Sequence, residues 1–84
     1  MLLVLDIGNT NIKTGLFDGG TLKNSWRMTS EFGRTSDEYG VMMESFFAHI
    51  GIPPDVVTGV IISSVMPSIN YTLEHMCSLY FPNP

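Results

Sequence analysis

The chain begins with an almost continuous apolar run, LLVLDI at residues 2–7. A run of this kind is typical of a strand that is buried on both faces of a sheet, because a strand with one solvated face alternates between apolar and polar residues. The run contains an acid near its end, Asp6, and the short polar segment at residues 8–10 follows it directly. We therefore expect a central strand whose carboxyl end carries a charge beside a tight turn.

Two further strands are predicted at residues 11–18 and 21–29, because apolar and polar residues alternate in both segments. They are joined at residues 18–20 by Asp-Gly-Gly, which favours a tight hairpin because glycine accepts a positive φ. The first thirty residues therefore predict an antiparallel meander. The residues expected on its covered face are Ile12, Thr14, Leu16, Leu22, Trp26 and Met28.

A helix is predicted next. Thr35 and Glu38 match the capping-box pattern, and apolar residues then recur at helical spacing over residues 39–50. Gly51, followed by two prolines, predicts the end of this helix.

A second mostly apolar run at residues 56–65 predicts another buried strand. Because a helix precedes it, we expect a parallel crossover connection to the first strand. Pro67 suits the first turn of a second helix, and Pro82 suits its end. The single cysteine, Cys77, falls in the apolar stripe of that helix, so we expect it to be packed and unreactive.

The predicted order is β-β-β-α-β-α, which indicates an α/β chain with a mixed sheet and a central first strand. This is the opening of a ribonuclease-H-like fold, which normally adds another strand and helix. Hydrophobic residues make up 44% of the chain and charged residues only 14%, an apolar balance for a small free-standing domain. We therefore expect residues 1–84 to be the N-terminal part of a longer protein, truncated before the remaining strands and helices.

The charge balance disfavours several classes of partner. The net charge is -4 with four basic residues, and these form no cluster that could follow a nucleic-acid backbone. No signal peptide or membrane-spanning run is evident, and one cysteine fits a reducing compartment. We expect a cytoplasmic protein with no nucleic-acid or membrane partner.

The residues around the first turn suit a phosphate site. Asp6 offers a carboxylate for Mg²⁺, the small residues 8–10 allow backbone N–H groups to approach an anion, and Lys13 adds a positive charge. A polar hairpin in which Asp6 only caps the turn is an equally good interpretation at this stage. The chain contains neither a P-loop motif nor a dinucleotide-binding fingerprint.

Ser63 and Ser64 end the second apolar run at the same predicted sheet edge as Asp6. They could bind a ligand or the phosphate hairpin, or they could cap the helix that follows. A two-metal nuclease needs several converging carboxylates, and this strand end offers serines instead, so a nuclease is disfavoured. Arg27 precedes the loop before the first helix and could anchor that loop or reach a ligand, although a solvated strand face is favoured.

The segment DIGNTNIKTGLF resembles the first phosphate motif of the actin, sugar-kinase and heat-shock-chaperone ATPase superfamily. WRMTSEFGRTSDEYG and IISSVMPSINYTLEHMCSLYF resemble the matching segments of type III pantothenate kinases, in the right order and spacing. The resemblance implies ATP-dependent phosphorylation of pantothenate to 4'-phosphopantothenate, the first step of coenzyme A biosynthesis. It also implies that residues 1–84 are the N-terminal part of the first of two ribonuclease-H-like domains, with the second domain absent. The members that it implies are cytoplasmic homodimers that need Mg²⁺ and a monovalent cation, K⁺ or NH₄⁺. The ATP-binding residues that it implies are Asp6, which would lie near Mg²⁺ and contact it through water, Ile7, Gly8, Asn9, Thr10, Asn11, Ile12 and Lys13.

The chain departs from this family by lacking its G-x-D-R pantothenate motif, its catalytic aspartate and its second phosphate motif. No catalytic residue can be assigned, and we expect the chain alone to be inactive and to bind ATP weakly. A nucleotide-gated interaction module like actin or chaperone ATPase domains, or a pseudo-enzyme, is the alternative. A short stand-alone adaptor is a third interpretation, which an exposed sheet edge argues against.

Overall fold

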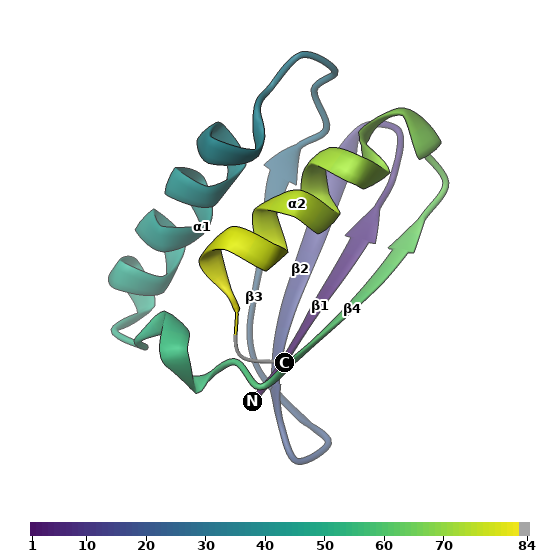
Figure 1. Ribbon diagram of the computed structural model, residues 1–84. Coiled ribbons are helices and arrows are strands. Elements are labelled where there is room, and N and C mark those ends of the chain that lie inside the picture. Colours follow the sequence, from purple (N-terminus) through teal and green to yellow (C-terminus); the bar gives the residue numbers. More distant parts are fainter. Residues whose placement is uncertain (83–84) are drawn as a thin grey trace.

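Four strands and two α-helices, in the order β-β-β-α-β-α, make up residues 1–82, the part of the chain that the computed structural model describes (Figure 1). The last two residues of the range 1–84 lie outside it. No helix in the described part could cross a membrane, which takes about 20 apolar residues. The elements are β1 (Leu2–Ile7), β2 (Asn11–Asp18), β3 (Thr21–Thr29), α1 (Ser36–Ile50), β4 (Gly59–Ser64) and α2 (Asn70–Tyr80), with 3₁₀ turns at Pro54–Val56 and Pro67–Ile69.

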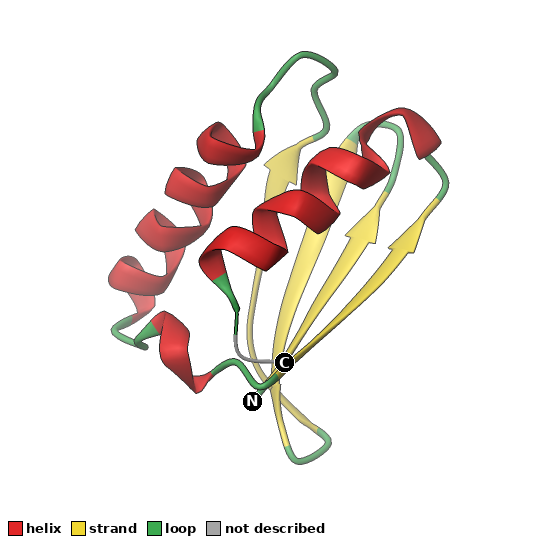
Figure 2. Ribbon diagram, viewed as in Figure 1, coloured by secondary structure: helices red, strands yellow, loops and turns green. Residues whose placement is uncertain are grey.

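The strands form one mixed sheet in the order β3-β2-β1-β4. β1 lies inside it, antiparallel to β2 and parallel to β4. The predicted α/β class, the mixed sheet, the inner position of the first strand and the parallel crossover are therefore confirmed. Figure 2 shows that both helices lie on the same side of this sheet.

The covered face of the sheet supplies most of the core. Leu3, Leu5 and Ile7 of β1 have no exposed surface, whereas Leu2 and Val4 on the other face are partly exposed. Ile61 of β4 is 51% exposed. The prediction that these two apolar runs are buried on both faces is wrong within residues 1–82, because both helices pack on one face. The fully buried side chains are Leu3, Leu5, Ile7, Ile12, Leu16, Tyr39, Met43, Phe47, Val57, Leu73 and Met76.

A β-bulge changes the direction of one predicted core residue. Leu16 pairs with Asn24, but Phe17 pairs with Leu22, so β3 carries one extra residue between the two pairs. Because side chains alternate along a strand, one extra residue sends the β3 side chains before the bulge to the opposite face from the one that simple alternation predicts. Leu22 is therefore 51% exposed on the uncovered face. The prediction that placed it beside Trp26 on the covered face is wrong.

The second apolar run also begins its strand later than predicted. Pro54 starts a 3₁₀ turn that ends at Val56, and β4 begins only at Gly59. Proline suits the first position of such a turn, because its φ is fixed and it has no N–H to satisfy. Pro67 likewise starts a 3₁₀ turn, so α2 begins at Asn70 rather than at the proline.

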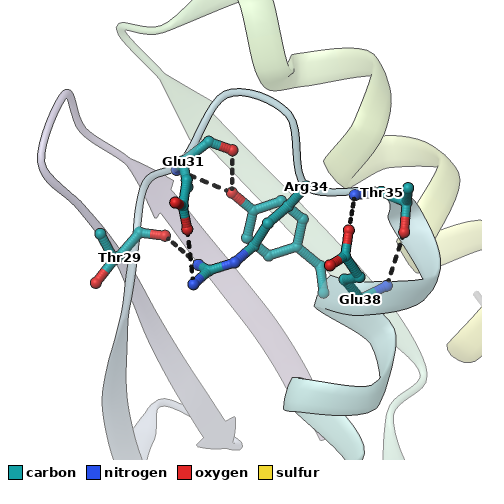
Figure 3. A network of polar contacts seen from close by, with 6 residues as sticks. Thr29, Glu31, Arg34, Thr35 and Glu38 are labelled. Atoms are coloured by element: carbon teal, nitrogen blue, oxygen red, sulfur yellow. Dashed lines mark hydrogen bonds and ion pairs between the residues drawn. The ribbon is translucent and has the colours of Figure 1, made fainter.

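The predicted boundaries of α1 are confirmed. Thr35 accepts a hydrogen bond from the Glu38 N–H, and the Glu38 carboxylate accepts one from the Thr35 N–H (Figure 3). Two backbone donors that the helix leaves free are satisfied in this way. Gly51 ends the helix with φ 74°, a left-handed conformation that glycine adopts without steric cost.

The two helices meet where α1 has a glycine. A Cβ atom on Gly40 would lie 2.2 to 2.5 Å from three atoms of the Tyr80 ring. The Tyr80 hydroxyl donates a hydrogen bond of 3.0 Å to the Asp37 carboxylate one turn earlier in α1. The missing side chain of Gly40 therefore admits the ring, and the hydrogen bond holds the ring in that position.

The single thiol is buried under α2, as the sequence predicts. Cys77 is 7% exposed. Burial, and secondly the negative charge of Glu74, raise the pKa of its thiol from 9.0 to about 11. Little thiolate, the reactive form, is present at neutral pH.

Substituting Gly40→Ala should destabilise the chain. Alanine improves helix propensity by about 1 kcal/mol, but overpacking a filled contact costs about 1–3 kcal/mol. We expect a net loss of about 1 kcal/mol in the free energy of unfolding, measured by urea titration. The control introduces Gly40→Ala into a chain that already carries Tyr80→Ala. Because the ring is then absent, the alanine at position 40 should increase the free energy of unfolding relative to Tyr80→Ala alone. A Gly40→Ala variant of the parent chain whose free energy of unfolding equals or exceeds that of the parent would contradict this packing.

Cys77 should resist alkylation by iodoacetamide at pH 8 while the chain is folded, and react readily in guanidinium chloride, because unfolding returns its pKa to the ordinary range. Since the folded pKa is the higher one, the thiol contributes stability below pH 9 and loses that contribution as the pH rises from 9 to about 11. Labelling is followed by mass spectrometry, with glutathione as the reference thiol. Equal labelling rates for the folded and unfolded chain would show that Cys77 is accessible.

Candidate functional site

A polar row crosses the uncovered face of the sheet at the carboxyl end of β1. Asp6 pairs with Lys13 of β2 and with Ser63 of β4, and Lys13 pairs with Arg27 of β3. Residues that are directly paired point to the same face, and all four are exposed. The row therefore combines one carboxylate, two positive charges and a hydroxyl. The carboxyl ends of parallel strands, here β1 and β4, are where open α/β sheets bind ligands.

The turn next to this row is tight, as the sequence predicts. The Gly8 N–H donates to the Asn11 carbonyl over 2.9 Å, and Asn9 and Thr10 at the tip are exposed. A Cβ atom on Gly8 would lie 3.1 Å from the Asn11 carbonyl oxygen, so a larger residue would crowd the turn. The absence of a side chain at Gly8 thus allows the turn to be this tight.

The two serines at the end of β4 point to opposite faces. Ser63 pairs with Asp6 and shares the polar row, whereas Ser64 pairs with the buried Ile7. The Ser64 hydroxyl accepts a hydrogen bond of 3.0 Å from the Met66 N–H. This bond lies within the turn that follows β4. Neither the 3₁₀ turn at Pro67–Ile69 nor α2 has a side-chain cap, so the alternative in which these serines cap the following helix is wrong. Ser63 alone has the position of a ligand-contacting residue, and that role stays a prediction.

Asp6 is the candidate contact for a metal ion. Within residues 1–82 no three His, Cys, Asp or Glu side chains come close enough together to hold a metal by themselves. A single exposed carboxylate nevertheless suits Mg²⁺ held mainly by water and substrate phosphates, the usual arrangement at phosphoryl-transfer sites. It does not suit two-metal hydrolysis, which needs several carboxylates.

The loop between β3 and α1 is held by a network of polar contacts (Figure 3). Arg34 donates to the Thr29 carbonyl over 2.9 Å, forms an ion pair with Glu31 at 2.8 Å, and lies 5.7 Å above the centre of the Tyr39 ring. The Tyr39 hydroxyl donates to the Glu31 carbonyl and accepts from the Glu31 N–H, both at 3.1 Å. The arginine that anchors this loop is therefore Arg34, while Arg27 lies in the polar row.

Ser30, at the start of that loop, contacts the turn at residues 8–11 and was not singled out from the sequence. Its hydroxyl donates to the Gly8 carbonyl over 2.7 Å, and its N–H donates to the Thr10 carbonyl over 2.9 Å. Ser30 and Gly8 are 22 residues apart. The sequence offers one signal, which is that Ser30 directly follows the predicted third strand. That this strand ends beside the turn, with Thr29 paired to Asn11, comes from the structure.

Comparison with known proteins gives one consistent result. Residues 2–84 match the family model described as type III pantothenate kinase. A protein named type III pantothenate kinase from Brevibacillus brevis (strain 47) is 49% identical over 80 residues, which are 95% of this chain and 31% of that protein. Proteins of the same name from Anaeromyxobacter sp. (strain K) and Geobacillus kaustophilus are each 46% identical over 81 residues, which are 96% of this chain and 32% and 31% of those proteins. The chain spans about a third of the length of the curated relatives it matches.

Proposed function

The chain belongs to the type III pantothenate kinase family, and on that premise we propose that the segment at residues 6–13 binds the phosphates of ATP in an enzyme that phosphorylates pantothenate. The side chains of Ile7 and Ile12 are fully buried in the core, so their part in this segment is packing rather than ligand contact. The product is 4'-phosphopantothenate, and the reaction is the first step of coenzyme A biosynthesis. The observation that carries the proposal is the meeting of Asp6, Lys13 and the open turn at one sheet edge. A carboxylate, a positive charge and backbone donors are the groups that a metal-bound polyphosphate needs.

We assign separate roles to these residues. The backbone N–H groups of residues 9–11, with the side chains of Asn9 and Thr10, donate hydrogen bonds to the β- and γ-phosphates, and Lys13 offsets their charge. Asp6 would hold Mg²⁺ through water, and the metal would supply positive charge to neutralise the phosphate oxygens. Ser63, beside Asp6, adds a hydroxyl at the edge of the site.

The catalytic contribution of this part of the chain is positioning and charge stabilisation. Phosphoryl transfer requires the phosphate to be held in line with the attacking hydroxyl, and a rigid turn at the end of a buried strand holds it firmly. We assign no catalytic base or pantothenate contact within residues 1–82. Those roles fall to the part of the relatives that this chain does not span.

The proposal extends to fold and assembly. Residues 1–84 form the first part of a ribonuclease-H-like domain of the actin-like ATPase type, compatible with the mixed sheet and two helices of the structure. The complete enzyme has a second domain, works as a cytoplasmic homodimer, and uses K⁺ or NH₄⁺ beside Mg²⁺.

The 84-residue chain alone should bind Mg·ATP weakly and should not phosphorylate pantothenate, because one turn offers few contacts. We expect a Kd weaker than about 0.1 mM in a calorimetric titration. A coupled assay of ADP release with pantothenate should give no signal above the blank. Tight ATP binding, or phosphorylation at a normal enzymatic rate, would contradict this part of the proposal.

A chimera in which this chain replaces the matching third of the Brevibacillus brevis protein should be an active pantothenate kinase. Asp6→Asn in the chimera should lower kcat/KM by about 100-fold, the usual cost of removing one electrostatic contact to a reacting group. Asp18→Asn is the matched control: it removes the same charge from an exposed residue at the opposite end of β2 and should change activity less than about twofold. A chimera that binds ATP without phosphorylating pantothenate would favour the interaction module or pseudo-enzyme instead.

A further inference from the structure

The turn at residues 8–11 lacks half of the hydrogen bonding of an ordinary hairpin turn. In a two-residue hairpin the flanking residues, here Gly8 and Asn11, each donate an N–H to the other's carbonyl. The Gly8 N–H does so, but the return bond from Asn11 is not among the backbone hydrogen bonds of residues 1–82. The Gly8 carbonyl instead accepts from the Ser30 hydroxyl over 2.7 Å.

The backbone angles fit this open form. The favoured two-residue hairpin turns need a positive φ at one or both central positions. Among residues 1–82 only glycines have a positive φ, so Asn9 and Thr10 do not adopt such a turn. The turn is thus kept out of its usual closed geometry.

Peptide geometry then decides where the turn's donors point. The described residues contain no cis peptide bond, and in a planar trans peptide the carbonyl and the following N–H point in opposite directions. Ser30 holds the carbonyls of Gly8 and Thr10 on its own side, through its hydroxyl and its N–H. The N–H groups of Asn9 and Asn11 therefore point away from the Ser30 loop.

Ser30 is itself held in place by the neighbouring loop. Arg34 connects the loop to the end of β3 by donating to the Thr29 carbonyl (Figure 3). Tyr39 of α1 is fully buried, and its hydroxyl accepts from the Glu31 N–H and donates to the Glu31 carbonyl. Ser30 lies between these two anchored residues. The loop thus supports Ser30 from both the sheet and the helix.

We propose that Ser30 is a positioning residue that holds the turn open, so that the Asn9 and Asn11 N–H groups remain available to oxygens of a nucleotide's phosphate chain. This inference rests on the proposed function, because it assumes that the turn receives phosphate. Without the Ser30 hydroxyl, the Gly8 carbonyl is free to accept the Asn11 N–H, which closes the turn and removes one donor from the site.

The test is a titration of the ¹⁵N-labelled chain with Mg·ATP and, separately, with Mg·tripolyphosphate, followed by NMR. In the parent chain both ligands should shift the Asn9 and Asn11 amide signals. Ser30→Ala should raise Kd about tenfold for both ligands, the effect of losing one hydrogen bond to a charged group. Ser30→Thr keeps the hydroxyl and should restore binding to within about threefold of the parent. Ser78→Ala is the matched control, since its hydroxyl also donates to a backbone carbonyl over 2.7 Å, at the far end of α2, and it should leave Kd unchanged.

The outcomes separate the two proposals. No binding of either ligand to the parent chain would overturn the proposed phosphate role and this inference with it. If Ser30→Ala lowers thermal stability but leaves Kd unchanged, the inference alone is overturned, and the role of Ser30 is only structural.

Amide exchange in the free parent chain is a check that needs no variant. The Asn11 amide should exchange faster than the Gly8 amide, and a protected Asn11 amide would overturn the inference.

Discussion

The burial of one side of β1 is the constraint on which the other positions depend. Leu3, Leu5 and Ile7 are fully buried against the two helices, and a shift of one residue in either neighbouring strand would turn apolar side chains into solvent. The registers with β2 and β4 are therefore strongly specified. Those registers place Asp6 on the uncovered face, beside Lys13 and Ser63. The polar row is thus a consequence of the core, because alternation along a strand sends Asp6 to the face opposite Leu5.

The second requirement is a rigid connection between the sheet and α1. The β3–α1 loop contacts the end of β3 through Arg34, the helix through Tyr39, and the turn at residues 8–11 through Ser30. Each contact is a single hydrogen bond or a pair of them, with a net contribution to stability of about 1 kcal/mol each. Their effect is geometric, because they fix which way the carbonyls of a three-residue segment point. A phosphate site built from backbone donors depends on that direction more than on side-chain identity.

Covering only one face of the sheet explains the apolar composition of a chain with few charges. The helices cover one face of the sheet, most completely over β1 and β2, and the other face carries partly exposed apolar residues such as Leu2, Val4 and Ile61. The bulge in β3 adds Leu22 to this face. The polar row occupies the carboxyl end of the same face, so its charged residues lie next to an apolar area that would lower the local dielectric if it were covered.

Local features were readable from the sequence. Alternation predicted β2 and β3, and the capping box and Gly51 predicted the limits of α1. The Asp-Gly-Gly turn and the tight polar turn after β1 were recognisable from residue type, because each depends on neighbours only a few positions away. The proposal that residues 6–13 bind phosphate rests on the same local chemistry and on a family resemblance, and it stays a prediction. Tertiary structure alone decided which way Leu22 faces, that Ser63 rather than Ser64 shares a face with Asp6, that Arg34 anchors the loop, and that Ser30 donates hydrogen bonds to the turn at residues 8–11. These depend on a bulge, on strand register and on hydrogen bonds between residues as far as 22 positions apart, and a pattern of neighbouring residues carries no information about distances of that kind.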